Sequence, residues 1–331
     1  MRKKVLLLIN RFMDLYKDII NELENQNYDV TYFEDFAVDD DPFLIRNRTW
    51  PDSKYRQREE QLTNYWKSYF DGYKGNLNFD VLLVVEGMSV CKAFIDVINR
   101  HNPHIRKVLY LYDRTYNNYR FDLNFHFYDR VFTFDRLDSK KYDISLLPIY
   151  WIPVTETEKT KFLLFGFATY QKERYRIFKE LYYACNYLGK TSYVKLYIPK
   201  EKNKFKLFVK RILCKDETIK IDPDLISNTT LTPSEFRKYI SLSEAVLDTH
   251  NSFQDGLTAR FMWALGSGKK IITTNQSVKE YSFYNRTQIY ILGEDTYPIE
   301  AFLASDTAIT KEQHCSIEQF RIDNWIKTLI S

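Results

Sequence analysis

The sequence predicts an α/β protein built from two Rossmann-like domains that face a central cleft. Short apolar runs, typical of buried parallel strands, alternate with stretches that have the apolar spacing of helices. This alternation stops around Leu147–Pro153 and then starts again. The chain has 331 residues, of which 44% are hydrophobic, so it is long enough to form two domains with a core each.

The first half follows a strand-then-helix order from its beginning. Lys4–Ile9 is a continuous apolar run, Phe12–Gln26 has helical spacing, and Tyr28–Phe33 is the next strand, so a right-handed βαβ unit is expected. The further expected elements are a helix over 50–70, a strand over 80–85, a helix over 90–100, and strands over 107–112 and 129–134.

Pro148 and Pro153 bracket the interruption, which places a domain boundary there. We therefore expect domains over residues 1–152 and 153–315, followed by a C-terminal helix, within 316–331, that can cross back to the first domain. The second half predicts strands over 161–165, 193–198, 244–248, 270–274 and 288–292, a loop over 166–169, helices over 173–188, 232–242, 256–265 and 317–330, and a helical turn over 278–281.

Charge and cysteine content narrow the function classes. The 48 basic and 44 acidic residues nearly balance at a net charge of +4, so no nucleic-acid partner is expected. The four cysteines form no CxxC pair, which is typical of reduced thiols in a cytoplasmic protein. The apolar run at Val5–Ile9 is too short for a secretory signal, and no run has the length of a membrane span.

The turn Gln254-Asp255-Gly256-Leu257-Thr258 has the strongest potential to bind a ligand. It follows a predicted strand and opens a predicted helix, so its backbone N–H groups and the helix dipole suit a phosphate. Gly256 allows a ligand to approach closely. The alternative is a plain helix cap made by Asp255 or Thr258.

The residues around this turn resemble the C-terminal half of GT-B glycosyltransferases, especially the bacterial enzymes that build lipopolysaccharide and capsule. The matching residues are Gly256-Leu257-Thr258, Ala264-Leu265, Gly268-Lys269-Lys270 and Ile271–Asn275. The resemblance is specific over about residues 244–292, weaker over 161–188, and architectural alone in the first half.

The resemblance implies transfer of a sugar from a nucleotide-activated donor to a growing surface glycan. Residues 153–315 would bind the nucleotide sugar, and residues 1–152 would bind a glycan or lipid-linked acceptor. Many retaining members of the family carry two glutamates eight residues apart, and Asp255 and Trp263 stand at those positions here. Trp263 cannot accept hydrogen bonds from ribose hydroxyls, so ribose recognition must differ from that in the family.

The candidate site residues lie in loops at strand ends and at the starts of helices. Arg260, one turn into the predicted helix, is expected to stabilise the leaving diphosphate, and Glu86 and Asp113 are the candidate bases. The alternative is a salt bridge for Arg260, and a helix cap or a loop ion pair for Glu86 and Asp113. The candidate donor-binding residues are Gly166, Lys172, Arg174, His250, Gln254, Asp255, Gly256, Leu257, Thr258 and Asn275.

Neither a metal nor a cofactor is expected, because Asp39-Asp40-Asp41 lacks the spacing of a calcium loop and no Walker sequence occurs. Lys200–Lys215 interleaves basic and apolar residues, which suits contact with the inner face of a membrane; a solvated helix is the alternative. Three other functions remain open: a nucleotide-sugar epimerase, a polyol-phosphate transferase, and a non-catalytic partner that binds sugars or nucleotides.

Overall fold

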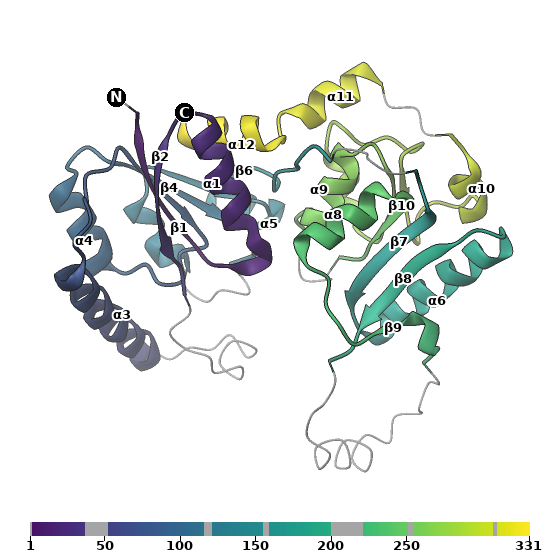
Figure 1. The fold of residues 1–331 in the computed structure, drawn as a ribbon, viewed down its shortest axis with the longest axis horizontal. Coiled ribbons are helices and arrows are strands. Elements are labelled where there is room, and N and C mark those ends of the chain that lie inside the picture. The colour runs from purple at the N-terminus through teal and green to yellow at the C-terminus, as the bar shows by residue number, and fades with distance from the viewer. Residues whose placement is uncertain are drawn as a thin grey trace, which may run out of the picture. The chain divides into compact units, whose positions relative to one another are not determined.

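The computed structural model describes residues 2–36, 52–115, 121–154, 159–199, 221–250, 255–306 and 310–331. The basic segment Lys200–Lys215 and the candidate Gln254 lie outside these residues. The chain divides into two compact units (Figure 1). Unit 1 comprises Met1–Trp151, Ser252–Leu257 and Glu318–Ser331, and unit 2 comprises Ile152–Asn251 and Thr258–Ile317.

Unit 1 contains a six-stranded sheet in the order β2-β1-β3-β4-β5-β6, and all of its strand pairs are parallel. Its strands are β1 (Lys4–Ile9), β2 (Asp29–Glu34), β3 (Val81–Val85), β4 (Arg106–Leu111), β5 (Arg130–Thr133) and β6 (Ser145–Leu146). Its helices are η1 (Phe12–Asp14), α1 (Leu15–Asn25), α3 (Asp52–Gly72), α4 (Lys92–His101), η2 (Phe121–Phe127), α5 (Arg136–Tyr142) and α12 (Ile322–Ile330).

Burial of both faces explains why the central strands of this sheet are almost wholly apolar. All five residues of β3 are buried, and so are five of the six residues of β1. On one face, Leu6 and Leu82 pack in the same core as Trp66 of α3 and Phe94 of α4. Polar side chains are therefore confined to the strand ends, where the loops begin.

The C-terminal helix α12 packs within unit 1. Trp325 is fully buried, its ring lies edge-on to Tyr110 of β4 at 4.7 Å between centroids, and its Nε1 donates to the Pro148 carbonyl. Gln26 follows α1 and donates through Nε2 to the Asp323 carbonyl, so α12 lies beside α1 (Figure 1). The C-terminal end of the chain thereby completes the core that its first strands begin.

Unit 2 contains a second six-stranded parallel sheet in the order β12-β11-β10-β7-β8-β9. Its strands are β7 (Phe162–Thr169), β8 (Ser192–Tyr197), β9 (Ile226–Ser227), β10 (Ser243–Asp248), β11 (Lys270–Thr273) and β12 (Ile289–Ile291). Its helices are α6 (Lys172–Tyr187), η3 (Pro223–Leu225), α8 (Pro233–Ser241), α9 (Ala259–Gly266), η4 (Gln276–Glu280), α10 (Ile299–Ala304) and α11 (Lys311–Glu318), the last of which ends one residue beyond the unit.

The two parallel sheets confirm the predicted fold class of two Rossmann-like α/β domains. Three local expectations were wrong. Gly166 lies inside β7 and not in a loop, because the strand continues to Thr169. The helix expected from Gly256 begins at Ala259, where Thr258 caps it through its hydroxyl. The single helix expected over 317–330 is two helices, since α11 ends at Glu318 and α12 begins at Ile322.

Among the helices of the described residues, none is both long enough and apolar enough to cross a membrane.

Replacement of Trp325 by alanine tests the contribution of α12. We expect Trp325→Ala to lower the free energy of unfolding by about 3–5 kcal/mol, because it leaves a large cavity against β4. Urea denaturation measures this loss, and Lys327→Ala, on the exposed side of the same helix, is the control. Equal stability of the two variants would show that α12 adds little to the core of unit 1.

Candidate functional site

The strand order of unit 2 predicts a ligand crevice between β7 and β10. From β7 the chain first builds the sheet toward β8 and β9, and then returns to add β10, β11 and β12 on the other side. The loops after β7 and β10 are therefore expected to diverge at the carboxyl ends of these two strands, where ligands bind in sheets of this kind. Arg174 lies in the first turn of α6, after β7, while Asp248 ends β10 and Arg260 lies at the start of α9.

Asp248, Arg174 and Arg260 form a group that we call the two-arginine cluster. Asp248 Oδ1 accepts the Thr258 hydroxyl at 2.7 Å and lies 3.7 Å from Arg260 Nε. The guanidinium groups also donate to strand-end carbonyls: Arg174 Nη1 to Thr169 O at 3.3 Å, and Arg260 Nη1 to Leu247 O at 3.5 Å. Thr169 ends β7 and Leu247 lies in β10, so the strands themselves position both arginines.

The two-arginine cluster holds more positive than negative charge in a poorly solvated place. Burial lowers the pKa of Arg174, and the nearby charge of Arg260 lowers it further, while Asp248 opposes both effects. Burial likewise lowers the pKa of Arg260 against the attraction of Asp248. One carboxylate thus serves two guanidinium groups, so an added anion would be stabilised here.

The same place contains buried donors that have no hydrogen-bond partner in the part of the chain that the structure describes. Arg174 Nε, Arg260 Nε and the Thr249 hydroxyl are buried, and none of them has a hydrogen-bond partner among the described residues. Buried polar groups are nearly always paired, so unpaired donors beside two guanidinium groups indicate where a ligand with several acceptor oxygens would bind.

His250 and Asn275 follow neighbouring strands at the same edge of the sheet. His250 Nδ1 lies 2.7 Å from the Thr274 hydroxyl, which also accepts the His250 backbone N–H at 3.1 Å. Asn275 is buried and caps η4, where its Oδ1 accepts the Ser277 N–H. Within the described parts of the chain, no three His, Cys, Asp or Glu side chains come together closely enough to hold a metal ion.

Two other predicted donor-binding residues lie in positions less suited to contact a ligand. Lys172 is exposed at the first position of α6. Gly166 packs within the sheet, where an added Cβ would lie 3.2 Å from the Leu247 Cβ. Its small size serves packing between β7 and β10, and it presents no loop amide to a ligand.

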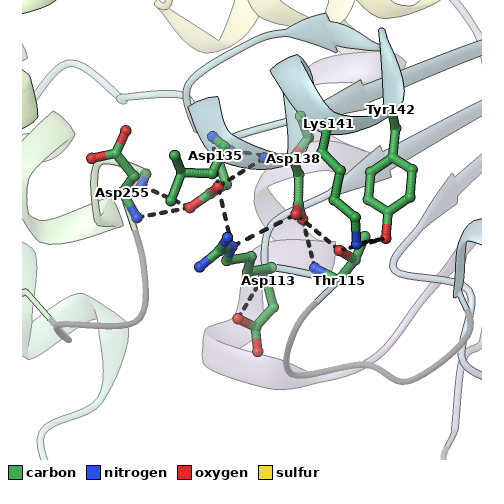
Figure 2. Close-up of polar contacts among 11 residues, drawn as sticks. Asp113, Thr115, Asp135, Asp138, Lys141, Tyr142 and Asp255 are labelled. Atoms are coloured by element: carbon green, nitrogen blue, oxygen red, sulfur yellow. Dashed lines mark hydrogen bonds and ion pairs between the residues drawn. The ribbon is translucent and has the colours of Figure 1, made fainter.

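The backbone amides expected to grip a diphosphate already have a partner. The N–H groups of Asp255 and Gly256 donate to Asp135 Oδ2 at 2.8 and 3.1 Å (Figure 2). The other oxygen of Asp135 accepts the N–H groups of Leu137 and Asp138 at the start of α5. Figure 2 shows the Asp255 side chain pointing away from this carboxylate. An internal carboxylate of unit 1 therefore occupies the position that the sequence assigned to a phosphate.

Packing holds the rest of this turn and its helix in the interior. A Cβ on Gly256 would lie 2.4 Å from two carbons of the Phe134 ring, and Leu257 is buried. Trp263 is fully buried, and the Arg237 guanidinium lies 5.3 Å from its ring centroid. Trp263 thus packs in the core at the position where retaining members of the resembled family carry a glutamate.

In unit 1, the two candidate bases have different environments. Glu86 is buried with its backbone at φ 73°, and its Oε1 accepts the N–H groups of Tyr112 and Asp113. Its carboxylate therefore turns back onto the chain. Burial raises the pKa of Glu86 well above its usual range, and the charges of Asp113 and Asp35 add to this effect. Asp113 is half-buried, and its Oδ1 accepts the Arg114 N–H.

Sequence reasoning missed Asp248, Thr249 and Asp135 as site residues. Asp248 and Thr249 directly follow the apolar run Ala245–Leu247, and a polar pair at the end of a buried strand is a signal that could have identified them. No signal of this kind links Asp135 to Asp255, because 120 positions separate them along the chain.

No family model and no curated protein matches the sequence. Among solved structures, the chain is similar to a putative UDP-N-acetylglucosamine 2-epimerase from Listeria monocytogenes, with 12% identity, a TM-score of 0.46, and coverage of 99% of this chain and 94% of that one.

Two further solved structures are similar to about the same degree. The match to MurG from Acinetobacter baumannii has 9% identity, a TM-score of 0.47, and coverage of 99% and 98%. The match to the calicheamicin glycosyltransferase CalG4 has 10% identity, a TM-score of 0.45, and coverage of 99% and 96%.

Gly256→Ala tests the packing of the turn in unit 1. We expect a loss of about 1–3 kcal/mol in unfolding free energy, because the new methyl group would displace the buried Phe134 ring. Chemical denaturation gives the value, and Gly72→Ala is the control, since nothing lies within 4 Å of a Cβ there. A neutral Gly256→Ala variant would contradict the close contact with Phe134.

The raised pKa of Glu86 predicts that the free energy of unfolding depends on pH. The folded state favours the protonated carboxyl, so its stabilising contribution is present below the ordinary pKa of glutamate and is lost as pH rises through the folded value. We expect the stability gained by Glu86→Gln over the unmodified protein to increase from about pH 5 to about pH 8. Denaturation across this range, with exposed Glu24→Gln as control, measures the trend; a gain independent of pH would refute it.

Proposed function

We propose that this chain is a glycosyltransferase that moves a sugar from a nucleotide-activated donor to a growing surface glycan of the lipopolysaccharide or capsule type. The single observation that carries the proposal is the two-arginine cluster at the crevice between β7 and β10. A nucleoside diphosphate needs cationic, multidentate donors in a place with little water, and two guanidinium groups that share one carboxylate supply them.

Unit 2 would bind the donor. Arg174 and Arg260 would donate to the diphosphate through their Nε atoms, and the Thr249 hydroxyl would add a third hydrogen bond. During transfer, the bond between the anomeric carbon and the diphosphate oxygen breaks, and negative charge develops on the leaving diphosphate. Fixed guanidinium groups stabilise that charge, so the proposed reaction needs neither a metal nor a cofactor.

Unit 1 would bind a glycan or lipid-linked acceptor. We assign Asp113 as the base that takes the proton from the attacking acceptor hydroxyl, because Asp113 is half-buried at a strand end. Glu86 would support it by holding the backbone amide of Asp113. The reaction would take place in the cytoplasm, and contact of Lys200–Lys215 with the inner face of the membrane remains a prediction from the sequence.

Arg174→Ala tests donor binding directly. We expect at least about tenfold weaker binding of nucleoside diphosphates, because one charge-assisted contact contributes about 1.5–3 kcal/mol. Isothermal titration calorimetry with UDP, GDP, dTDP and CDP, and with their glucose conjugates, gives the affinities. Arg260→Lys, which keeps the charge next to Asp248 but alters the geometry, should also weaken binding.

Arg176→Ala is the matched control, because Arg176 is exposed two positions along the same helix. Nucleotide affinity equal in Arg174→Ala and Arg176→Ala would contradict the assigned site. A non-catalytic partner with an inactive site would bind none of the nucleotides. Release of free nucleotide only when an acceptor is present distinguishes a transferase from an epimerase.

A further inference from the structure

The strand order of unit 1 predicts a second crevice, between β1 and β3. The chain leaves β1 toward β2 at one edge of the sheet and continues from β3 in the opposite direction. The loops after β1 and β3 therefore separate at their carboxyl ends, as at the corresponding point of unit 2. In the loop after β3, the N–H groups of Gly87, Met88 and Ser89 all donate to the buried carboxylate of Asp35. These backbone donors are therefore already hydrogen-bonded within unit 1.

The loop after β1 instead exposes an aromatic side chain. Phe12 is 56% exposed, and it is the only phenylalanine among the large exposed hydrophobic side chains of the described residues. Its ring is stacked with Tyr112, which follows β4, at 5.9 Å between centroids and 15° between planes. An apolar ring is thus held in solvent by a second ring behind it.

Hydrogen bonds fix both rings in this position. Asn10 Oδ1 accepts the Phe12 N–H at 2.9 Å, and Asn10 Nδ2 donates to the Tyr112 hydroxyl at 2.6 Å. Glu86 accepts the Tyr112 backbone N–H at 2.6 Å. The exposed ring of Phe12 is therefore preorganised by side chains that follow β1 and β3.

The backbone after Phe12 is strained as well. Met13 and Asp14 adopt φ of 49° and 52°, in the left-handed region that residues other than glycine rarely enter. Burial of Phe12 does not offset this strain, because its ring stays exposed. Strain maintained beside a ligand crevice is characteristic of a functional site.

We propose that Phe12 is the stacking platform for a sugar ring of the acceptor. This inference rests on the proposed function and names the chemistry of its acceptor site. The C–H groups on one face of a pyranose pack against an exposed aromatic ring, while the hydroxyls at its edge form hydrogen bonds. Asp113, directly after Tyr112, follows β4 and can accept such a bond.

The test compares Phe12→Ala with the conservative Phe12→Tyr. The full-length proteins are applied to an array of immobilised mono- and oligosaccharides. Calorimetry with UDP, GDP, dTDP and CDP measures donor binding separately. We expect Phe12→Ala to lose about tenfold or more in glycan affinity, Phe12→Tyr to retain it, and nucleotide affinity to stay unchanged. Tyr187→Ala, at an 85% exposed tyrosine of α6, is the control and should retain glycan binding.

Equal glycan binding by Phe12→Ala and the unmodified protein overturns the inference, and so does an unmodified protein that binds no glycan. Binding of adenosine or uridine that depends on Phe12, without glycan binding, also overturns it in favour of a base-stacking site. The proposed function is tested separately by the calorimetry: it fails if the unmodified protein binds no nucleotide. Thermal unfolding confirms that each variant is folded.

Discussion

Burial of both faces of two parallel sheets determines where chemistry can occur in this chain. Strands such as β1, β3 and β10 are covered on either side, so their interiors are apolar and their polar residues come at the ends. The carboxyl ends of parallel strands gather at one edge, and the strand order opens that edge at a single point in each sheet. The two-arginine cluster and the Phe12–Tyr112 pair lie at these two points.

Internal carboxylates accept hydrogen bonds from the backbone amide groups that could otherwise bind a phosphate. Asp35 accepts three successive N–H groups after β3, and Asp135 accepts those of Asp255 and Gly256. Clustered backbone amides are common anion sites, so filling them with buried aspartates leaves anion binding to side chains. In unit 2, the buried Nε atoms of Arg174 and Arg260 have no hydrogen-bond partner among the described residues.

The two units carry different side chains at the carboxyl ends of their central strands. Unit 2 presents cations and unused donors, which suit a diphosphate. Unit 1 presents stacked aromatic rings next to carboxylates, one of which, Glu86, is held by backbone amides in a place where burial favours its protonated form. The proposed charged donor in unit 2 and the proposed hydroxyl-rich acceptor in unit 1 are consistent with this difference.

Local patterns in the sequence determined the fold class and most of the strands and helices, because apolar runs and helical spacing directly reflect burial. They also identified Arg174, His250 and Arg260 as residues that follow strands of one sheet. Only the tertiary structure decided which groups meet. The link from Asp135 to the Gly256 turn, the contact of Arg260 with the Leu247 carbonyl and the inward turn of Glu86 join residues that are 121, 13 and 26 positions apart. Such contacts depend on strand order and register, which apolar periodicity does not encode.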